Sequence, residues 1–549
     1  MMMKSNVYRN LIFFILSFLI VAFSQPAWIG FLGIFAAIFG YSFFWLSICD
    51  VKSSKLKFLI SFIYFFLVQS IWLSWMTSTK YQGSLIFIVY FFILSWFALQ
   101  FGIISYIALK NKKVTFLKIF LVSAIWCTFE YSRLFFMCGF SFNQVGMALA
   151  HHHLPMQIAT VFGIFGLSFY VIFVNLTAYK AFLEKSFKLI SLWLILAIFP
   201  YVYGYLHEKI YEKKFASAET INVCLVQTAL LPEQKVLTKN HFDDFISPIV
   251  QWARIINFIN QQRFDNIDLI ALPEAALPFG ANDHFYPLKM VQNLFENKFG
   301  QDVLQKLPDL KAPFAKIYDD IWYVSNSFFA KTLSNIYNAK VVIGLDDVDE
   351  KLNQSYNSAF FFEKNIPTYE RYEKQILVPM GEYIPFSYLA DLALKKYGIT
   401  SSFTPGLDAK IFSQKDAFAL SICYEETYPN IMRKARLKGA RCFVNLTNDA
   451  YFFKSKLFRQ HFDHAKVRTV ENGIPLVRAC NSGVSAAVDS FGRVIAAIYE
   501  EDVAKALIVK VPLFSYKTIY TLFGDYLIIT ICVIIFFISF IKNRKKRLF

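Results

Sequence analysis

The stretch Ala419-Leu-Ser-Ile-Cys423-Tyr-Glu425-Glu-Thr-Tyr-Pro429 places a cysteine at the end of an apolar, strand-like run and ahead of a helix. Backbone N–H groups at such a junction can lower the pKa of a thiol and bind an oxyanion. A cysteine that closes a buried strand is, however, more often an inert core residue. Cys423 is therefore a candidate nucleophile only in combination with reactive side chains elsewhere in the chain.

Two other stretches supply such side chains. In Leu269-Ile-Ala-Leu-Pro-Glu274-Ala-Ala-Leu-Pro278 a carboxylate follows an apolar strand and lies between two prolines. Partial desolvation would make it a usable base, although a strand-end cap or an ion pair is the plainer interpretation. In Tyr372-Glu-Lys374-Gln-Ile-Leu-Val-Pro-Met-Gly-Glu382-Tyr-Ile-Pro385, glycine and prolines indicate a rigid loop that holds Glu382 in place. Taken alone, the lysine there reads as a solvated surface charge.

The segment from residue 206 to residue 518 alternates β-rich runs with helical stretches. Several runs are continuously apolar and rich in β-branched residues, as expected of strands buried on both faces. The expected strands are Ile221–Gln227, Ile267–Leu272, Lys340–Gly344, Ser358–Phe362, Phe418–Cys423, Cys442–Asn445, Ile474–Cys480, Ser485–Asp489 and Ala506–Val511. Helices are expected at 241–263, 426–438 and 457–472. The pattern predicts a layered α/β domain, with residues 281–334 as an irregular, mobile arm over the site or the membrane.

The rest of the chain is too apolar for a water-facing fold. Of 549 residues, 56% are hydrophobic and 19% aromatic, and the excess lies toward the two ends. Because about 20 apolar residues cross the ~30 Å hydrocarbon layer, eight spans are expected. They lie at about 7–24, 27–49, 58–76, 84–108, 115–132, 159–179, 187–205 and 519–541. The first run also fits a cleavable signal peptide, but Gln25-Pro26 and the span that follows at once favour a retained hairpin.

Basic residues orient these spans, because lysine and arginine concentrate on the cytoplasmic side of a membrane. They gather at both ends and in alternate loops, whereas the opposite loops hold only Lys80 and Arg133. The gathered residues are Lys4, Arg9, Lys52, Lys55, Lys57, Lys110, Lys112, Lys113, Lys118, Lys180, Lys185, Lys188, Lys542, Arg544, Lys545, Lys546 and Arg547. Both termini are therefore expected in the cytoplasm, and residues 206–518 in the periplasm of a two-membrane cell. The net charge of +17 reports this topology and not nucleic-acid binding, since residues 206–518 are nearly neutral.

A strand-end glutamate, a lysine and a strand-end cysteine in this order resemble the catalytic triad of the nitrilase superfamily. Other stretches resemble further elements of that superfamily: Asn445-Leu-Thr-Asn-Asp-Ala-Tyr-Phe452, Gln460-His-Phe462 and Arg478-Ala-Cys-Asn-Ser-Gly483. Together with the spans, they make the chain similar to the apolipoprotein N-acyltransferase family. The membrane part carries stretches like that family's at Phe23-Ser24, Trp28, Glu130-Tyr-Ser-Arg133, Gly139-Phe-Ser-Phe-Asn143 and Gly163-Ile-Phe-Gly-Leu-Ser-Phe169. The resemblance covers essentially the whole chain except about residues 281–334. Three residues differ from those common in that family: Leu272, Met380 and Tyr451. All three keep apolar bulk, so the differences concern only the acyl pocket.

This resemblance implies an αββα sandwich domain at 206–518, between seven spans in 1–205 and one span in 519–549. It implies transfer of a fatty acyl chain from a membrane phospholipid to the α-amino group of the N-terminal S-diacylglyceryl cysteine of apolipoproteins. Cys423 would form a thioester, Glu274 would move protons and Lys374 would stabilise the oxyanion. The supporting residues would be Glu382, Tyr424 and Glu425. The resemblance further implies a monomer in the bacterial inner membrane, with no metal or other cofactor.

Two other interpretations stay open on the sequence alone. A membrane-tethered amidase of the nitrilase type would share the triad and use water as the second acceptor, so only its substrates would distinguish it. A transport or receptor protein with a ligand-binding outer domain is disfavoured by the complete triad and by the few charges within the spans.

Some residues outside the triad also invite a functional interpretation. His151-His152-His153 has no neighbouring Asp, Glu or Cys, and we expect no metal there. Glu130 and Arg133 are expected to face the bundle, either as an ion pair or at the lipid entrance. An oxidising compartment permits disulfides among the cysteines at 224, 442 and 480, but the sequence does not pair them.

Overall fold

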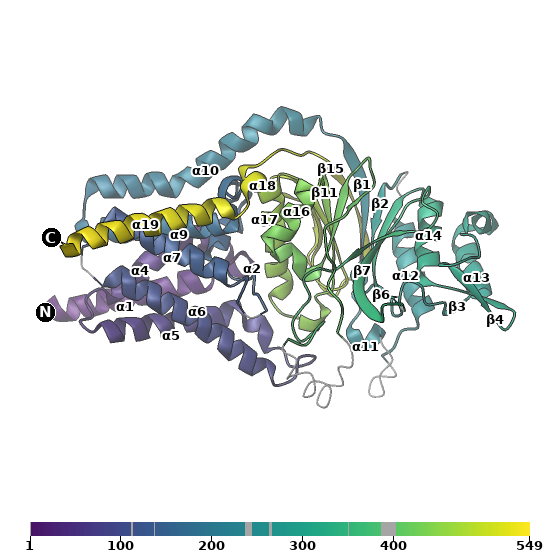
Figure 1. The fold of residues 1–549 in the computed structure, drawn as a ribbon, viewed down its shortest axis with the longest axis horizontal. Helices are drawn as coiled ribbons and strands as arrows, with labels where there is room; N and C mark the ends of the chain where they lie inside the picture. The colour runs from purple at the N-terminus through teal and green to yellow at the C-terminus, as the bar shows by residue number, and fades with distance from the viewer. Residues whose placement is uncertain are drawn as a thin grey trace. The chain divides into compact units, whose positions relative to one another are not determined.

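In the computed structural model the chain forms two compact units (Figure 1). The first comprises Met1–Lys213, Ser455–Gly473 and Lys517–Phe549, and the second comprises Lys214–Lys454 and Ile474–Tyr516. The structure describes residues 2–110, 113–136, 138–235, 244–262, 266–349, 351–385 and 402–548. The helix predicted at 457–472 is present as α17 (Leu457–Asn472), and its contacts assign it to the first unit.

Apolar helices make up the first unit. The longer ones besides α17 are α1 (Met2–Ala22), α5 (Ser54–Trp72), α6 (Ile86–Leu109), α7 (Phe116–Ser132), α9 (Ala159–Glu184), α10 (Phe187–Ala216) and α19 (Tyr526–Leu548). The shorter ones are α2 (Pro26–Ile29), α3 (Leu32–Phe35), α4 (Tyr41–Ile48), α8 (His153–Met156) and α18 (Ile519–Phe523). Among the described residues, α5, α6, α9 and α10 are long and apolar enough to cross a membrane. Shorter apolar helices lie at Val7–Ala22, Leu32–Ile48 and Tyr526–Lys542. The membrane-helix class is confirmed, and the count of eight spans remains a prediction.

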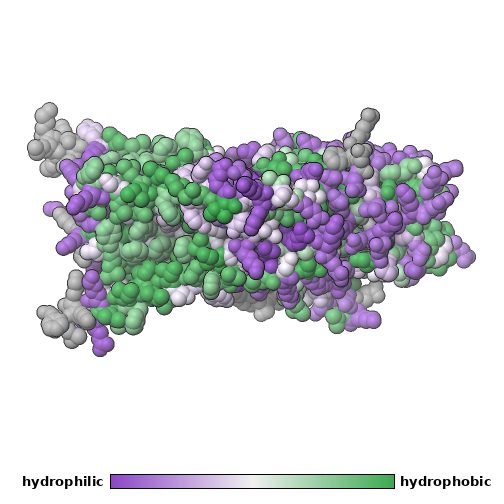
Figure 2. Space-filling model, turned by 90° about the horizontal axis from the view of Figure 1, so that it is seen from above, coloured by the Kyte–Doolittle hydropathy of each residue, from purple (hydrophilic) through white to green (hydrophobic). Residues whose placement is uncertain are grey.

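The outside of this unit is apolar. Figure 2 shows hydrophobic side chains covering a broad band of it. At least half of the surface of Leu59, Phe91, Ile195 and Phe537 is exposed. An exposed apolar area of this extent is unfavourable in water and fits a lipid environment.

The predicted span at 27–49 is not one regular helix. It consists of α2, α3, a π-helical turn at Ala36–Gly40 and α4. The buried amide of Asn175 in α9 supports that turn: its Nδ2 donates 2.9 Å bonds to the carbonyls of Ala36 and Ala37, and its Oδ1 accepts from the Tyr41 N–H at 2.9 Å. Such a side chain satisfies backbone groups that a π-turn frees where water is absent.

Two six-stranded sheets form the second unit. The first has the order β15-β1-β2-β6-β7-β8, with β1 (Thr220–Gln227), β2 (Leu269–Ala271), β6 (Lys340–Asp349), β7 (Gln354–Phe362), β8 (Glu370–Glu373) and β15 (Lys505–Pro512). The second has the order β14-β13-β12-β11-β10-β9, with β9 (Ile411–Phe412), β10 (Phe418–Ile422), β11 (Cys442–Thr447), β12 (Leu476–Cys480), β13 (Ser485–Val488) and β14 (Val494–Ile498). Strands β1, β2 and β6 are parallel, as are β10, β11 and β12. All nine predicted strands are present. Sequence reasoning missed β8, β9 and β14.

The sheets pack face to face between helices. One apolar core lies between them and joins Val223, Leu225, Leu269 and Val342 to Leu420, Ile422, Val444 and Val477. A second core lies under α12 (Pro248–Gln261) and α14 (Asn326–Tyr337), where Trp252 and Phe329 pack against residues of the first sheet such as Ile270 and Val341. The short helix α16 (Pro429–Leu437) contacts β10 of the second sheet. The layered α/β prediction is confirmed. Of the helix predicted at 241–263, residues 241–243 and 263 lie outside the described residues.

The prediction of an irregular arm at 281–334 was wrong in one respect. The segment holds β3 (Tyr286–Pro287), α13 (Leu288–Phe299), β4 (Ala315–Tyr318), β5 (Ile321–Val324) and the start of α14. The strands form a sheet in the order β3-β5-β4. Single buried residues such as Val291, Phe295 and Val324, spaced among polar ones, anchor this segment in the core, and so isolated an apolar signal is hard to recognise in a sequence.

Candidate active site

The three predicted triad residues each lie at the end of a strand in the second unit. Glu274 comes three residues after β2, Lys374 directly follows β8, and Cys423 directly follows β10. Tyr372 and Phe361 of the first sheet share a core with Ile422 of the second, so β8 and the end of β10 face one another. The fold therefore presents a carboxylate, an ammonium and a thiol where the two sheets meet.

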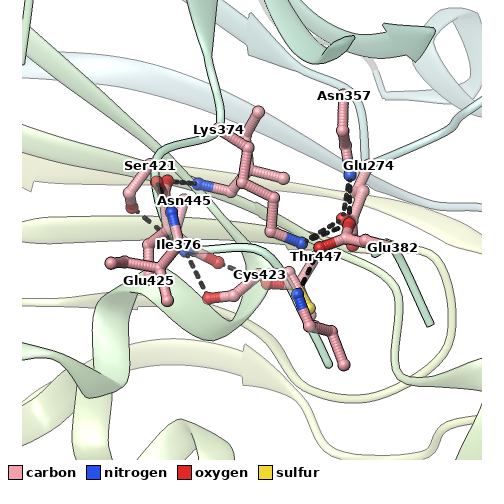
Figure 3. A network of polar contacts seen from close by, with 12 residues as sticks. Glu274, Asn357, Lys374, Ile376, Glu382, Ser421, Cys423, Glu425, Asn445 and Thr447 are labelled. Carbon is pink, nitrogen blue, oxygen red and sulfur yellow. Dashed lines mark hydrogen bonds and ion pairs between the residues drawn. The ribbon is translucent and has the colours of Figure 1, made fainter. Parts of the chain in front are cut away.

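A buried polar network surrounds the Lys374 ammonium (Figure 3). Its Nζ donates to Glu274 Oε1 at 3.0 Å and to Glu382 Oε1 at 2.7 Å. Asn357, on β7, donates through Nδ2 to the same two oxygens at 2.8 and 2.7 Å. The second oxygen of Glu382 accepts from the Val378 N–H at 2.7 Å, which ties the loop predicted to be rigid to its own backbone. Two acidic side chains are thus fixed around one cation.

This network keeps Lys374 positively charged. Only 1% of the Lys374 surface is exposed, and burial alone would lower its pKa. The charges of Glu274 and Glu382 outweigh that cost and hold the pKa of Lys374 well above its ordinary value. Lys374 is therefore suited to stabilise negative charge and unsuited to accept a proton.

The turn that carries Glu274 fits tightly against β6. The Gly344 N–H donates to the Pro273 carbonyl at 3.1 Å, and the Ala276 N–H donates to the Gly344 carbonyl at 2.9 Å. A Cβ on Gly344 would lie 2.6 Å from the Glu274 Cα, closer than any side chain permits. The missing side chain of Gly344 lets the backbone of the base approach the sheet.

Cys423 occupies a strained junction between β10 and a short 3-10 turn (Cys423–Thr427). Its φ of +52° lies in the left-handed region, which is unfavourable for a residue with a Cβ. Asn445 Nδ2, on β11, donates to the Cys423 carbonyl at 3.3 Å and to Ser421 Oγ at 3.0 Å, which fixes this junction from the neighbouring strand. Strain retained at a reactive side chain is typical of a nucleophile.

The Cys423 thiol is protonated at rest. Removal from water and the charge of Glu274 raise its pKa well above the ordinary value, and the Lys374 ammonium offsets only part of this effect. A thiol of this kind attacks only when a base takes its proton, and Glu274 is a carboxylate whose charge reaches it.

Glu425 joins β10, the nucleophile strand that ends before Cys423, to the lysine loop, which is the segment from Lys374 to Pro385. It is fully buried, and its carboxylate accepts from the N–H groups of Gln375 at 2.5 Å and Ile422 at 2.7 Å and from the Tyr372 hydroxyl at 2.8 Å. Burial raises the pKa of Glu425 from 4.5 to about 7. The predicted supporting position of Glu425 thus corresponds to a physical link between the segments that carry Cys423 and Lys374.

The residues after Cys423 are anchored by other contacts. The Tyr428 hydroxyl donates to the Tyr424 hydroxyl at 3.1 Å, and the two rings form an edge-to-face aromatic pair. Arg478 on β12 donates to Glu426 Oε1 at 2.8 Å and to Asp449 Oδ2 at 3.2 Å, all three side chains being buried. This ion-pair cluster holds the turn after the nucleophile against β12.

Sequence reasoning missed two members of the site. Asn357 lies within β7 and bridges both carboxylates, but an asparagine inside a β-run carries no catalytic pattern. Tyr372 was expected only as part of a loop, whereas its hydroxyl contacts both oxygens of Glu425. Both act from within strands, and only the three-dimensional pairing of the strands reveals them.

Three further expectations concern residues outside this network. In the first unit, Glu130 Oε1 accepts from Trp126 Nε1 at 2.9 Å, and Arg133 Nε donates to Gln100 Oε1 at 2.9 Å. The two side chains face the bundle as predicted but do not form an ion pair among the described residues. The histidine run 151–153 has no acidic neighbour in the sequence, but in the fold His153 Nδ1 lies 2.6 Å from Glu208 Oε1. None of the eight cysteines forms a disulfide bond in the part of the chain that the structure describes.

Comparison with known proteins agrees with this architecture. Residues 10–177 match the apolipoprotein N-acyltransferase N-terminal domain, and residues 250–518 match the carbon-nitrogen hydrolase family. The apolipoprotein N-acyltransferase of Chlamydia pneumoniae is 32% identical over 541 residues, covering 94% of each chain. The protein of that name from Chlamydia trachomatis is 30% identical over 564 residues, covering 98% of each chain, and that from Chlamydia caviae is 30% identical over 534 residues, covering 93% of this chain and 94% of the relative. The chain therefore belongs to the apolipoprotein N-acyltransferase family.

Proposed function

We propose that this protein transfers a fatty acyl chain from a membrane phospholipid to the α-amino group of the N-terminal S-diacylglyceryl cysteine of apolipoproteins, the last step of lipoprotein maturation. The observation that carries the proposal is the Lys374 ammonium bound between Glu274 and Glu382. It lies in the same unit as a strained, protonated thiol at the end of β10, a strand of the other sheet. Membership of the family assigns this chemistry to acyl transfer.

The first half-reaction forms an acyl-enzyme. Glu274 takes the proton of the Cys423 thiol as Sγ attacks the ester carbonyl of the phospholipid. Lys374 and a backbone N–H near Tyr424 stabilise the negative charge on the carbonyl oxygen of the tetrahedral intermediate. The C–O bond then breaks, the lysophospholipid leaves with the proton held by Glu274, and a Cys423 thioester remains.

The second half-reaction transfers the acyl group to an amine. The neutral α-amino group of the acceptor attacks the thioester carbonyl while Glu274 accepts one of its protons. Collapse of the second tetrahedral intermediate breaks the C–S bond, and the proton returns from Glu274 to the sulfur of Cys423. The products are an N-acylated acceptor and the free enzyme, so the two substrates react in a ping-pong order. Neither half-reaction requires a metal or another cofactor.

Glu382, Asn357 and Glu425 support these steps by position. Glu382 and Asn357 hold the shared Glu274–Lys374 pair in one geometry. Glu425 fixes the lysine loop to the last residue of the nucleophile strand. Since a misplacement of about 1 Å can cost ~10²-fold in rate, residues of this kind matter without touching substrate.

The membrane part accounts for the choice of substrates. The chain is a bacterial membrane protein with apolar helices in its first unit. Both proposed substrates are anchored in the same bilayer, whereas a membrane-tethered amidase that acts on small amides would gain nothing from such a bundle. The full-length match to acyltransferases therefore disfavours the amidase alternative. We further propose that the termini are cytoplasmic, that the second unit faces the periplasm, and that the enzyme acts as a monomer.

The test is mass spectrometry of a diacylglyceryl-cysteine peptide after incubation with phospholipid and the purified full-length protein. Wild type is compared with Cys423→Ala. A mass gain of one fatty acyl group at the N-terminal amine, absent with the variant, is the expected result. Well-folded wild type that leaves the peptide unchanged but hydrolyses a small soluble amide would overturn acyl transfer in favour of the amidase.

A further inference from the structure

A second buried lysine lies beside the turn that carries Glu274. Lys235 ends the short helix α11 (Pro232–Lys235), and only 6% of its surface is exposed. Its Nζ donates a 2.7 Å hydrogen bond to the carbonyl of Ala275, the residue directly after Glu274. Ala275 has a left-handed backbone (φ +44°). A non-glycine residue persists in that conformation only where its surroundings hold it, and Lys235 supplies such a restraint.

Lys331 shows what a purely structural buried lysine looks like in the same unit. It is also 6% exposed, and its ammonium donates to three backbone carbonyls, those of Glu363, Lys364 and Ile366, at 2.7, 3.1 and 2.7 Å. All three N–H donors are thus used. Lys235, equally buried, makes one hydrogen bond and no ion pair with the described residues. Burying an ammonium with so few partners is costly, which argues that its charge is kept for its effect on the neighbouring site.

The electrostatic neighbourhood points to Glu274 as the group affected. Burial lowers the pKa of Lys235 to about 8, and Glu274 leads the charges that oppose this effect, ahead of Cys480 and Asp346. The ammonium is therefore close enough to the carboxylate to interact with it. The charged and titratable groups that face Glu274 are Lys374 after β8, Glu382 in the lysine loop, Asp346 on β6, Cys423 after β10, Tyr451 after β11 and Lys235 on α11. Among these groups, only Lys374 and Lys235 are cationic.

We propose that Lys235 is a positioning residue for the base. Its hydrogen bond to Ala275 fixes the turn that presents Glu274, and its ammonium places a second positive charge beside the carboxylate. The proposal rests on the proposed acyl transfer, in which Glu274 must be ionised to accept the thiol proton. Lys374 faces the network of Glu382 and Asn357, whereas Lys235 acts through the backbone of the turn.

The test measures the pH dependence of acyl transfer by full-length Lys235→Met, Lys235→Arg and Lys331→Met. Lys235→Met removes a positive charge beside the carboxylate of the base, so the acid limb of its kcat profile is expected to move to higher pH. Its rate near neutrality is expected to fall roughly tenfold, a fraction of the ~10²–10⁴ that general acid–base catalysis supplies. Lys235→Arg keeps the charge and should retain the wild-type acid limb. Lys331→Met should lower the melting temperature and leave the acid limb in place.

The outcomes separate this inference from the proposed function. An inactive, folded wild type would contradict acyl transfer itself, whatever the lysine variants do. An active wild type with an unshifted acid limb in folded Lys235→Met would overturn only the role of Lys235. If Lys235→Met fails to fold, Lys235→Gln takes its place as the uncharged variant: an acid limb moved to higher pH supports the charge effect, and an unshifted one refutes it.

Discussion

Lys374 is a buried cation whose two carboxylate partners outweigh the cost of its burial. Its ammonium is almost fully buried, yet two carboxylates at 3.0 and 2.7 Å keep it protonated. A fixed positive charge in a place of low dielectric stabilises an oxyanion far more than the same charge in water does. The cation is held in a fixed position, because Asn357 donates hydrogen bonds to both of its carboxylate partners, Glu274 and Glu382.

Replacing Lys374 by Met should therefore lower kcat by roughly 10²–10³-fold, the usual loss when one oxyanion donor is removed. The matched control is Lys410→Met, which removes a half-exposed ammonium paired with Glu373. Exposed pairs contribute little, so this variant should stay within about twofold of wild type. Rates are measured by the mass shift of the acceptor peptide, with melting temperatures in parallel. A folded Lys374→Met enzyme of wild-type rate would remove the oxyanion role from Lys374.

Glu425 makes a prediction about pH and stability. Burial raises its pKa to about 7 in the folded protein, above the ordinary 4.5. Proton uptake by the folded state therefore adds stability that is fully present below about pH 4.5 and is lost as the pH rises through about 7. Glu425→Gln cannot titrate, so the melting temperature of wild type should fall relative to that of the variant between pH 5 and pH 7. Parallel curves over that range would contradict a raised pKa.

At the scale of elements, the site depends on how closely β6 approaches the turn after β2. Gly344 allows this approach, because any Cβ there would lie 2.6 Å from the Glu274 Cα and 2.8 Å from the Pro273 carbonyl oxygen. The same turn is bonded to Gly344 through both backbone groups. Small displacements of the strand would therefore move the base directly.

Gly344→Ala should consequently displace Glu274 and reduce the rate of acyl transfer by more than about tenfold. Overpacking of this kind also costs ~1–3 kcal/mol of stability. Gly30→Ala serves as the control, since the nearest atom to its added Cβ lies 3.7 Å away in ordinary contact. Activity and melting temperature are measured for both. A Gly344→Ala enzyme with wild-type activity would show that the position of the turn is not critical.

The elements also show what sequence could and could not predict. Strands β1, β2, β6, β10 and β11 were recognised because each is a buried apolar run, and Glu274 and Cys423 were found because each follows one. Strand β8 was missed because three of the four residues of Glu370-Arg-Tyr-Glu373 are charged and so give no apolar run. Asn357 and Lys235 were missed for a different reason: both contact the site across strands or turns distant in sequence, and neither residue type marks such a role.

At the scale of the whole molecule, the distribution of charge predicts the orientation in the membrane. Basic residues gather at both ends and in alternate loops between apolar helices. If the positive-inside rule holds, both termini lie in the cytoplasm and the second unit lies in the periplasm, where lipoprotein N-termini are acylated in this proposal.

Protease protection in spheroplasts tests this orientation. Protease added outside should cleave within the second unit and leave epitope tags at both termini intact, since they would be shielded by the membrane. Both tags should disappear only after the cells are permeabilised. Loss of either tag in intact spheroplasts would contradict cytoplasmic termini, and a protected second unit would contradict its periplasmic location.

The central claim is a covalent acyl-enzyme on Cys423, and intact-mass analysis of the full-length protein tests it most directly. Incubation with phospholipid alone should add one fatty acyl mass to the protein, and hydroxylamine should remove it, as it does a thioester. Proteolytic digestion should place the added mass on the fragment that contains Cys423. The adduct should be absent from Cys423→Ala and should disappear when the diacylglyceryl-cysteine peptide is added, with the same mass then appearing on the peptide. Acylation of the peptide by Cys423→Ala, or wild-type turnover with the acyl group on another residue, would contradict the mechanism.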